Sequence, residues 1–562
     1  MMKKWSVKLT AVMLSAALIL IPQTAFAGSP AKDTAPDAGI LQEKVLRWEA
    51  AATRYLYDDA APKAQPVRTE SRFIKQDGIY VNPDAETSNR ATLMITGDLM
   101  CQWRQQEAAF TGSGKDYLTY EEMQTVIAKV RQEYNAALEQ ALEVQPEITE
   151  AAVSESEPEP SEAIPEAVST AISSFTMPVL NYGLIPQPEG EWNFDESFQY
   201  VREILKKGDL VIGNLETMLS QSSPLTMQMR ILESRPYLNS PVAFLESLKY
   251  AGYDMLTLAN NHCCDTGVRG VLETIENIDA YNFMRTGMFS GEDDDRWMIA
   301  DVNGIKIGFA AYATYFNTKD ANFTEAGQDT LLNRFSYSRA RSDIRAMKKK
   351  GAEYVIIFMH WGRENTHEIS DNQQRYAAQA AKAGADYIVG SHPHALQPYE
   401  IIETADGRQV PVIYSMGNFL SCMTADVNND TQILQLDLAK SADGSVSVTS
   451  HRLYPCTILV DAEIKDSSGI VRTDSYVIVP QTESLRSGLV MDSSSLSISA
   501  REDTAYMKSS LSRFMAVYEN KTILDVPYDP YLLNRNLQEE DSLIRLQDIL
   551  LGRFRWIMAN QM

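Results

Sequence analysis

The histidines of this chain are few and are gathered in one part of it. The sequence of 562 residues contains six, and five of these lie between positions 262 and 394: His262, His360, His367, His392 and His394. Histidine is the commonest metal ligand among side chains, and its ordinary pKa lies closest to neutral pH. This clustering therefore indicates a metal site or a site of proton transfer.

Four of these histidines lie at or just beyond the end of an apolar run, as do two carboxylates and an amide. In chain order, the segments that hold them are Thr96-Gly97-Asp98, Gly213-Asn214-Leu215-Glu216, Asn260-Asn261-His262 with Asp265, His360-Trp361-Gly362-Arg363-Glu364, Gly390-Ser391-His392-Pro393-His394 and Tyr414-Ser415-Met416-Gly417-Asn418. A mixture of oxygen and imidazole ligands favours Mn, Fe or Zn over a calcium cage of oxygens alone. A pair of such ions can activate water and clamp a phosphoryl group for displacement.

The elements that position these segments can be read from apolar runs that alternate with helical stretches from Ala91 onward. The apolar runs are Leu93–Ile95, Leu210–Ile212, Met255–Leu258, Ile305–Ala311, Tyr354–Phe358, Tyr387–Val389 and Val412–Tyr414. The helical stretches are Pro241–Tyr250, Val268–Tyr281, Phe335–Lys349 and Asn372–Ala383. Such alternation is typical of strands buried on both faces by helices. The sequence thus predicts an α/β fold whose functional groups gather at the carboxyl ends of the strands.

Taken together and in this order, these segments resemble those of the CapA family, bacterial proteins of capsule or poly-γ-glutamate synthesis whose domain is grouped with the calcineurin-like metallophosphatases. The resemblance runs from Ala91 to about Ser421, apart from an insertion at 104–188. It implies a metallophosphatase-like sandwich of β-sheets flanked by helices. It also implies a cofactor, one or two divalent transition metal ions such as Mn, Fe or Zn.

The resemblance assigns roles to particular residues. Asp98 resembles the first aspartate ligand and Glu216 the bridging carboxylate. Asn261 and His262 resemble an Asn-His pair that binds metal and protonates the leaving group, and Asp265 is expected to orient His262. The metal ligands implied in this way are Asp98, Glu216, Asn261, His360, His392 and His394, and the implied catalytic residues are His262 and Asp265.

One position departs from the superfamily pattern. The first motif of these enzymes is Asp-x-His, whereas Met100 stands two residues after Asp98 in this chain. One metal would lack a ligand unless Cys101 or a neighbour takes the place of the histidine. A single-metal site and a purely binding site therefore stay open beside full two-metal chemistry.

Some of the polar residues also have purely structural interpretations. Asp265 could cap the helix that follows it. Arg363 and Glu364 could pair with each other at the surface, and Trp361 could be core packing or the apolar wall of a pocket. The two histidines that we expect to be structural are His367, at a helix start, and His451, in a strand.

The segments around the α/β domain predict a secreted, envelope-associated protein. Residues 1–27 are typical of a cleaved signal peptide, with three lysines, a short apolar run and the cleavage pattern Ala25-Phe26-Ala27, although an uncleaved N-terminal anchor is an alternative. The other predicted segments are an N-terminal accessory segment at 28–90, the α/β domain at 91–425 and strands with a helical segment at 426–562.

The insertion at 104–188 contains two different kinds of sequence. A capping box, Thr119-x-x-Glu122, predicts the start of an amphipathic helix. The tract at 145–167 holds seven Glu, four Pro and no basic residue. Such a tract cannot bury enough apolar surface to order itself, so we expect the insertion to be partly disordered.

Charge and cysteine content narrow the function further. The chain has 51 Lys and Arg against 75 Asp and Glu, a net charge of −24. Nucleic acids and anionic membranes attract basic surfaces, so no nucleic-acid partner is expected. The five cysteines are odd in number and show no C-x-x-C spacing, which argues against a zinc knuckle or a disulfide scaffold.

Three functions are compatible with these observations. The first, which the CapA resemblance implies, is a role outside the membrane in making or exporting capsule or poly-γ-glutamate, with an anionic envelope polymer or a phosphoester as substrate and a membrane synthesis complex as partner. The second is a secreted metal-dependent phosphoesterase that acts on an envelope phosphoester. The third is a non-catalytic binding module that retains the fold, which Met100 favours.

Overall fold

The structure is a computed structural model, and it describes residues 71–110, 119–143, 192–221, 237–317, 319–423, 425–466, 471–481, 496–498 and 501–519. The chain divides into two compact units, and the unit that includes 113–189 contributes one described helix, α4 (Tyr120–Glu143). The predicted signal peptide, the acidic tract at 145–167 and the amphipathic helix expected at 541–562 lie outside the described residues.

Helix α4 begins at the capping box that the sequence predicts. The backbone amide of Thr119 donates to Glu122 Oε2 at 2.9 Å, and the Glu122 amide donates to Thr119 Oγ1 at 3.2 Å. These reciprocal bonds satisfy two of the amides that a helix start leaves without partners. None of the helices among the described residues is long and apolar enough to cross a membrane.

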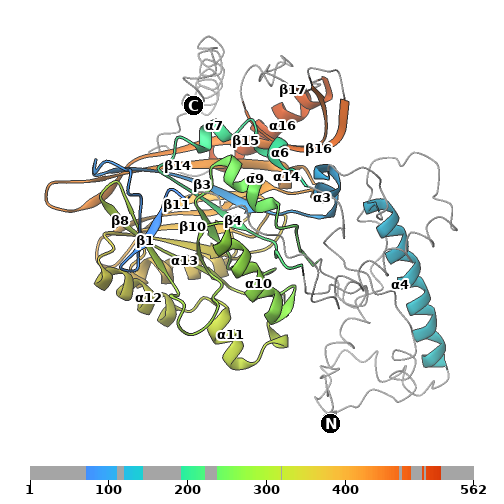
Figure 1. The fold of residues 1–562 in the computed structure, drawn as a ribbon, viewed down its shortest axis with the longest axis horizontal. Helices are drawn as coiled ribbons and strands as arrows, with labels where there is room; N and C mark the ends of the chain where they lie inside the picture. The colour runs from blue at the N-terminus through green and yellow to red at the C-terminus, as the bar shows by residue number, and fades with distance from the viewer. Residues whose placement is uncertain are drawn as a thin grey trace, which may run out of the picture. The chain divides into compact units, whose positions relative to one another are not determined.

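The second unit contains two large β-sheets (Figure 1). The first, sheet A, has eight strands in the order β1-β2-β7-β8-β9-β10-β12-β11. Its neighbours from β8 to β12 are parallel, and β11 is antiparallel to β12. Its strands are β1 (Ile74–Gln76), β2 (Ile79–Val81), β7 (Met298–Val302), β8 (Ile305–Ala313), β9 (Tyr354–His360), β10 (Tyr387–Ser391), β11 (Leu396–Glu403) and β12 (Gln409–Met416).

Sheet B has nine strands, seven of them in the order β16-β15-β14-β3-β4-β5-β6, while β13 pairs with β3 and β17 with β15. Strands β3, β4, β5 and β6 are parallel, and β14 is antiparallel to β3. The strands are β3 (Arg90–Leu99), β4 (Leu210–Leu215), β5 (Met255–Thr257), β6 (Met284–Thr286), β13 (Asn418–Leu420), β14 (Asp430–Lys440), β15 (Val446–Asp466), β16 (Val471–Pro480) and β17 (Leu496–Ile498).

The two sheets pack face to face over a shared apolar core, and strand β9 illustrates how. Successive side chains of a strand point to opposite faces of its sheet. Accordingly, Ile356 and Phe358 join the same buried cluster as Leu434 of sheet B, whereas Ile357 and Met359 join a second cluster on the outer face of sheet A. Because both faces of β9 are buried, its sequence is apolar throughout, as predicted for a covered strand.

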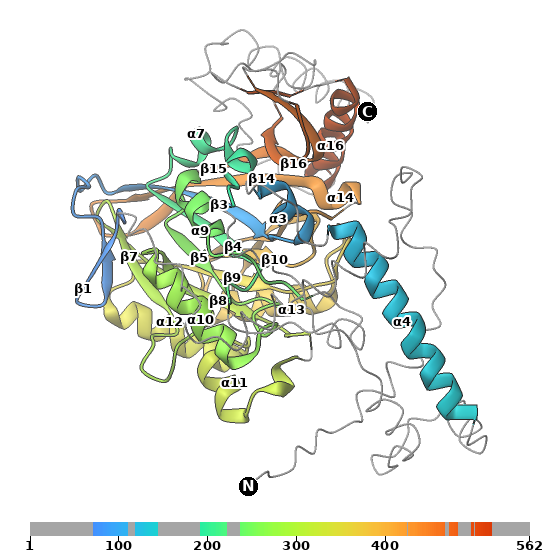
Figure 2. The same cartoon turned by 45° about the vertical axis from the view of Figure 1, so that its right-hand side comes forward.

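Helices cover the outer faces of the sandwich. Helices α12 (Tyr337–Lys350) and α13 (Asp371–Ala383) lie together beside sheet A in both views (Figures 1 and 2). Each ends at a glycine in the left-handed region, Gly351 with φ 108° and Gly384 with φ 118°, a conformation that favours glycine. Sheet B carries α9 (Phe244–Ala251) and α10 (Gly267–Ala280), whose buried residues join the core of that sheet.

The remaining helices are short or flank the sandwich. Helix α16 (Arg501–Glu519) lies beside β15 and β16 in both views (Figure 2). The others are α3 (Trp103–Ala109), α6 (Asp195–Phe198), α7 (Arg202–Leu205), the 3-10 helix η2 (Lys319–Asn322), α11 (Glu325–Leu331) and α14 (Asp426–Asn429). The predicted α/β class, with a sandwich of two sheets flanked by helices, is thus confirmed for the described residues.

Candidate metal centre

The polar segments singled out in the sequence follow the carboxyl ends of strands in both sheets. In sheet B, Asp98 is the last residue but one of β3, and Glu216 directly follows β4. In sheet A, His360 ends β9, and His392 directly follows β10. Parallel strands end at the same edge of a sheet, so the packing of the two sheets brings these side chains together.

Two glycines allow close backbone contacts near these side chains, one at the step from sheet A to sheet B and one between neighbouring strands of sheet A. A Cβ atom on Gly97 would lie 1.9 Å from the carbonyl oxygen of Gly417, and one on Gly390 would lie 2.0 Å from that of Tyr414. Only glycine fits at either position. The Asp98 amide donates to Gly417 O at 3.0 Å, and the chain then passes from β12 of sheet A through Gly417 into β13 of sheet B.

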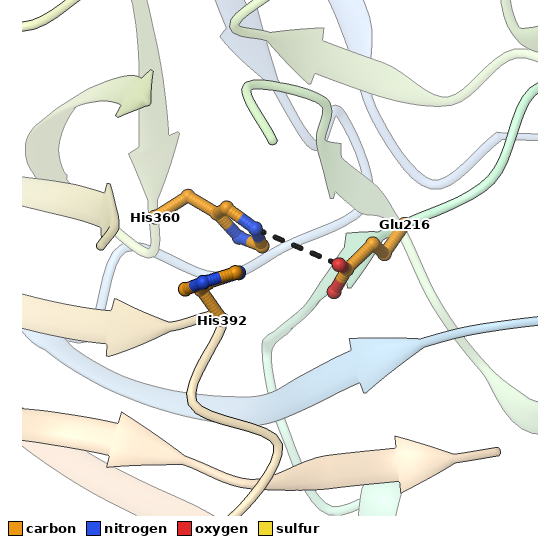
Figure 3. Close-up of side chains that lie close together, drawn as sticks. All are labelled: Glu216, His360 and His392. Atoms are coloured by element: carbon orange, nitrogen blue, oxygen red, sulfur yellow. Dashed lines mark ion pairs between the residues drawn. The ribbon is translucent and has the colours of Figure 1, made fainter. Parts of the chain in front are cut away.

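Glu216 lies between two sets of candidate ligands. One set is Glu216 with His360 and His392, and the other is Glu216 with Asp98 and His394; within each set the donor atoms lie within 4.8 Å of one another. Glu216 Oε1 lies 3.6 Å from His360 Nε2 and 3.8 Å from His394 Nε2. Figure 3 shows the carboxylate turned toward His360, with His392 beside it. Asp98, Glu216, Asn261, His360, His392 and His394 are called the candidate centre below.

The Glu216 carboxylate is fully buried, and neither of its oxygens makes a hydrogen bond with a described residue. Burial raises its pKa well above the ordinary value, and the neighbouring charge of Asp98 raises it further. A buried carboxylate that has no donor and lies beside a second carboxylate is costly unless positive charge lies close to it. The residues present therefore fit a divalent cation, with Glu216 shared between two positions.

The imidazoles of the candidate centre are in mutual contact. The ring centroids of His360 and His392 lie 4.8 Å apart. His360 Nδ1 lies 2.9 Å from Ser391 Oγ, and its Nε2 lies 2.8 Å from Asn261 Oδ1, so two neighbours fix the ring. Burial lowers the pKa of both His360 and His392 well below the ordinary value, and repulsion from neighbouring imidazoles lowers it further. Both rings are therefore held in the neutral form, which is the form that binds metals.

The segment that carries His392 and His394 has an unusual backbone. Both residues have positive φ, 96° and 54°, a region that side chains other than glycine seldom occupy. A hydrogen bond of 3.1 Å from the His392 amide to Asp98 Oδ2 holds the turn in place. His394 Nδ1 lies 2.8 Å from Asn418 Oδ1 and 3.5 Å from Asp98 Oδ2. Burial alone would lower the pKa of His394, but the adjacent Asp98 outweighs it and raises that pKa.

His262 and Asp265 form a buried pair beside the candidate centre. His262 Nδ1 lies 2.7 Å from Asp265 Oδ2, which also accepts the backbone N–H of Leu238 at 2.6 Å. The other carboxylate oxygen, Oδ1, accepts from Lys319 Nζ at 2.6 Å, and the Lys319 side chain is only 2% exposed. Because Asp265 is an acceptor toward Leu238 and Lys319, the His262 hydrogen belongs on Nδ1 and Nε2 is left to exchange a proton.

The structural alternatives for individual residues can now be compared with the coordinates. The N-cap residue of α10 is Thr266, so the Asp265 carboxylate does not cap this helix but lies against His262. No ion pair joins Arg363 to Glu364; instead Glu364 groups with His392 and His394 as a third set of candidate ligands. Trp361 is fully buried and also lines a pocket, so both of its proposed roles apply.

The two histidines that were expected to be structural lie away from the candidate centre. His451 lies in β15, where it is buried against Tyr387 of sheet A, as expected for a strand histidine. His367 lies in the segment before α13 and is partly buried, and its Nδ1 bonds the carbonyl oxygen of Leu396 at 2.7 Å. It is therefore a structural histidine, but a less exposed one than the sequence suggested.

Met100 stands where the superfamily motif has a histidine ligand, and Cys101 is the neighbour that could have replaced that ligand. Met100 is buried, and its amide donates to Leu420 O at 2.8 Å, which holds β3 to β13. Cys101 is fully buried, and burial raises the pKa of its thiol, which disfavours the thiolate that binds metals. Among the described residues, Cys101 belongs to none of the three sets of candidate ligands.

Sequence reasoning missed three residues of this region. Glu364 was treated as a surface residue, Lys319 was not considered, and neither was Tyr315, whose hydroxyl bonds His392 Nε2. Glu364 lies four residues after His360 and could have been included on that ground. Lys319 and Tyr315 follow strand β8, the one apolar run with no polar motif at its end, so nothing local marked them.

The known proteins that this chain is similar to align over the same segments. A family model for the bacterial capsule synthesis protein PGA_cap matches residues 92–423. The PGA biosynthesis protein CapA of Bacillus subtilis (strain 168) is 29% identical over 275 residues, which cover 47% of this chain and 66% of that protein. The capsule biosynthesis protein CapA of Bacillus anthracis is 27% identical over 255 residues, which cover 45% of this chain and 60% of that protein. The chain thus spans less than two thirds of the length of either relative.

Solved structures also match part of the chain. The calcineurin-like phosphoesterase YfkN of Bacillus subtilis matches with a TM-score of 0.30 and 16% identity, over 50% of this chain and 85% of that chain. The NAD nucleotidase of Haemophilus influenzae matches with a TM-score of 0.29 and 15% identity, over 49% of each chain. Since the family model covers more than half of the sequence, the chain belongs to the bacterial capsule synthesis protein family PGA_cap.

Proposed function

We propose that this protein works outside the membrane in capsule or poly-γ-glutamate biosynthesis or export, and that its candidate centre performs metal-dependent hydrolysis of a phosphoester in the envelope. The observation that carries the hydrolytic part is Glu216, a fully buried carboxylate whose oxygens make no hydrogen bond with the described residues and which two sets of ligands share. The envelope part rests on the family and on the predicted signal peptide at 1–27.

The donors of the candidate centre suit Mn, Fe or Zn, with one ion in each of the two ligand sets that share Glu216. A cation there would supply the positive charge that polarises a phosphoryl oxygen and makes a water molecule more acidic. Asp98 and Glu216 would provide the negative charge that holds it, and the neutral rings of His360 and His392 would complete the ligand set.

The other residues of the region would position groups and move protons. His262, with its hydrogen on Nδ1, would use Nε2 to exchange a proton with the leaving group. Asp265 would fix the tautomer of His262, and Lys319 would hold Asp265 in place. This division makes His262 the acid and base of the reaction and Asp265 its positioning residue.

A non-catalytic binding module is the second candidate function, and Met100 is the observation that favours it. With a buried thioether where the superfamily motif has histidine, one ion would be held more weakly. Met100→His tests this alternative: an increase in bound metal together with new phosphoesterase activity, in a chain whose wild type has none, would establish the binding module instead of the enzyme.

Metal content and hydrolysis of p-nitrophenyl phosphate, measured on the full chain, test the proposed function. After loading with Mn, Fe or Zn and removal of excess metal, we expect at least one bound ion and measurable turnover. His392→Ala should lose both, whereas His367→Gln, a change to a histidine outside the candidate centre, should keep both. Absence of bound metal would contradict the hydrolytic function, and full activity in His392→Ala would contradict the site.

The biological role has a separate test. Deletion of the gene should reduce the surface polymer, and the wild-type gene should restore it. A His262→Ala gene that restores the polymer equally well would show that the chain serves as a scaffold in synthesis and not as a hydrolase.

A further inference from the structure

A pocket of about 550 Å³ lies on the outer side of the candidate centre. Its walls come from the segments after β8 and β9 and from the first turn of α13. The residues that matter for the argument are Tyr315, Trp361, Gly362, Arg363, Asp371 and Tyr376. Sequence analysis assigned no ligand to this pocket, and the hydrolytic function proposed above does not use it.

Tyr315 joins the pocket to the candidate centre. Its hydroxyl bonds His392 Nε2, and the two rings meet edge to face with centroids 5.0 Å apart. A second link is Arg363 of the pocket, which directly precedes Glu364, and Glu364 groups with His392 and His394. A molecule in the pocket would therefore lie next to whatever reacts at the candidate centre.

The walls of the pocket are held firmly. The indole N–H of Trp361 donates to Tyr414 O at 2.9 Å, and its backbone amide donates to Ser391 O at 3.1 Å. Gly362 has a φ of 97°, and a Cβ there would lie 2.7 Å from the Gln373 carboxamide. Gln373 itself closes the capping box of α13. Both Arg363 and the first turn of α13 thus extend from fixed backbone, which lowers the entropic cost of binding.

The pocket contains two opposite charges that do not neutralise each other. The Arg363 guanidinium and the Asp371 carboxylate both line it, and both side chains are exposed. Among the described residues, neither side chain makes an ion pair or a hydrogen bond, with the other or with a third group. A guanidinium favours a carboxylate as partner, and a carboxylate favours an ammonium. The aromatic side chains of Tyr315 and Tyr376 also line the pocket, and they suit the aliphatic part of a ligand.

We infer that this pocket binds an α-amino acid group of the substrate, whose carboxylate pairs with Arg363 and whose ammonium pairs with Asp371, while the rest of the substrate extends past Tyr315 to the candidate centre. A purely anionic group would be repelled by Asp371, and a purely cationic group by Arg363. A zwitterionic group is the one class that satisfies both charges. The inference rests on the proposed function for the identity of the reacting end, but binding in the pocket needs no turnover.

Binding of three probes to the full chain tests the inference. The probes are L-glutamine, which carries both charges, N-acetyl-L-glutamine, which lacks the ammonium, and L-glutamine amide, which lacks the carboxylate. Saturation-transfer NMR and calorimetry, with and without EDTA, should show L-glutamine binding at least about tenfold more tightly than either of the other two, since a charged hydrogen bond contributes about 1.5–3 kcal/mol.

Variants of Arg363 and Asp371 test which residue pairs with the carboxylate of the ligand and which with its ammonium. Arg363→Gln and Asp371→Asn should each weaken L-glutamine binding by about tenfold or more. Arg363→Gln should raise the weak affinity for the cationic L-glutamine amide, and Asp371→Asn should raise that for the anionic N-acetyl-L-glutamine, because each change removes the charge that repels the probe. Arg345→Gln, a change to another exposed arginine that does not line the pocket, should bind L-glutamine like the wild type.

Three outcomes would overturn the inference: no measurable binding of L-glutamine, equal affinity for the three probes, or unchanged affinity in both pocket variants. Tighter binding of N-acetyl-L-glutamine than of L-glutamine would also overturn it, because the pocket would then select an anion. Each of these results is obtained without metal or turnover. A failure of the proposed hydrolytic function, seen as absent metal or absent p-nitrophenyl phosphate hydrolysis, is therefore distinguishable from a failure of this inference.

Discussion

Sheet B brings oxygen atoms to the candidate centre, whereas sheet A brings imidazole nitrogens. Strands β3 and β4 and the segment after β5 supply Asp98, Glu216 and Asn261. Strands β9 and β10 with the segment after them supply three histidines, His360, His392 and His394. Each of the two sets that share Glu216 takes ligands from both sheets, and together the sheets give the mixture of donors that a transition metal prefers. The site is therefore a property of the contact between the sheets, and a bound cation would join them.

The strongest test of this comparison is a change to Glu216, which belongs to both of the ligand sets that join the sheets. Glu216→Gln should lower phosphoesterase turnover by about a thousandfold or more, because both ion positions lose their shared carboxylate. In the presence of EDTA the same change should raise the free energy of unfolding, since it removes a buried and unsatisfied carboxylate. Differential scanning fluorimetry measures the effect on stability: we expect the variant to be more stable than the wild type without metal and less stable than the wild type with metal. Destabilisation under both conditions would mean that Glu216 is structural.

Removal of metal should affect the contact between the sheets more than the sheets themselves. If the cation is held at a concentration about a hundredfold above its dissociation constant, chelation should cost about 2.7 kcal/mol of stability. Hydrogen exchange should rise first at the amides that link the sheets, those of Asp98 and His392, whose acceptors are Gly417 O and Asp98 Oδ2. Exchange that rises equally along β9 and β14 would contradict a cation that joins the sheets.

The His262 pair should be separable from metal binding. Lys319→Met should reduce kcat by about tenfold to a hundredfold with unchanged metal content, because Asp265 loses the partner that fixes its carboxylate. Asp265→Asn should give a similar loss, and the double variant should lose little more, because the residues act in series. Lys319→Met alone leaves the buried Asp265 carboxylate without its partner, which could unfold the chain, and the double variant removes this charge as well. Loss of metal in these variants would place Lys319 in the ligand shell instead.

Acid should lower the stability of the core between the sheets by protonating His451, a histidine outside the candidate centre. Burial lowers the pKa of His451 to about 3. Its ordinary value is about 6.5, so the unfolded chain binds this proton first as the pH falls. The stability that the neutral ring contributes is complete above about pH 6.5 and is lost progressively toward pH 3, by about 2 kcal/mol at pH 5.

Urea unfolding at pH 7.5 and pH 5 measures this loss. His451→Gln should reduce the difference between the two pH values by about 2 kcal/mol, because the variant has no proton to gain at this position. His367→Gln is the matched control and should keep the wild-type difference. An equal pH dependence in His451→Gln and the wild type would mean that other groups cause the acid sensitivity.

The sequence located the parts of the fold that local pattern encodes. Apolar runs buried on both faces, such as Tyr354–Phe358, predicted the central strands, and helix starts and ends followed capping signals. Strands β1, β2, β6 and β7 were missed because they are short or have exposed positions, so their sequences lack a clear apolar run. Their positions are decided by pairing with distant strands, which no local window contains.

The residues of the site also differ in whether the local sequence marks them. Asp98, Glu216, His360 and His392 were identifiable because each lies within four residues of the end of an apolar run. Lys319 lies 54 residues from the Asp265 carboxylate that it contacts, and only the folded chain brings the two together. Tertiary partners of this kind leave no local trace in sequence, although they fix the tautomer and orientation of a catalytic ring.

Gly417 helps to set the distance between the histidines of sheet A and the oxygen ligands of sheet B. The chain steps from sheet A to sheet B through this residue, so one short covalent strap spans the gap between the nitrogen and the oxygen donors. New chain termini placed here in a circular permutant would leave every ligand present and both sheets intact. The backbone would then no longer fix the distance between the nitrogen and the oxygen donors. Ion selectivity, which depends on tenths of an ångström, would then be the first property to change.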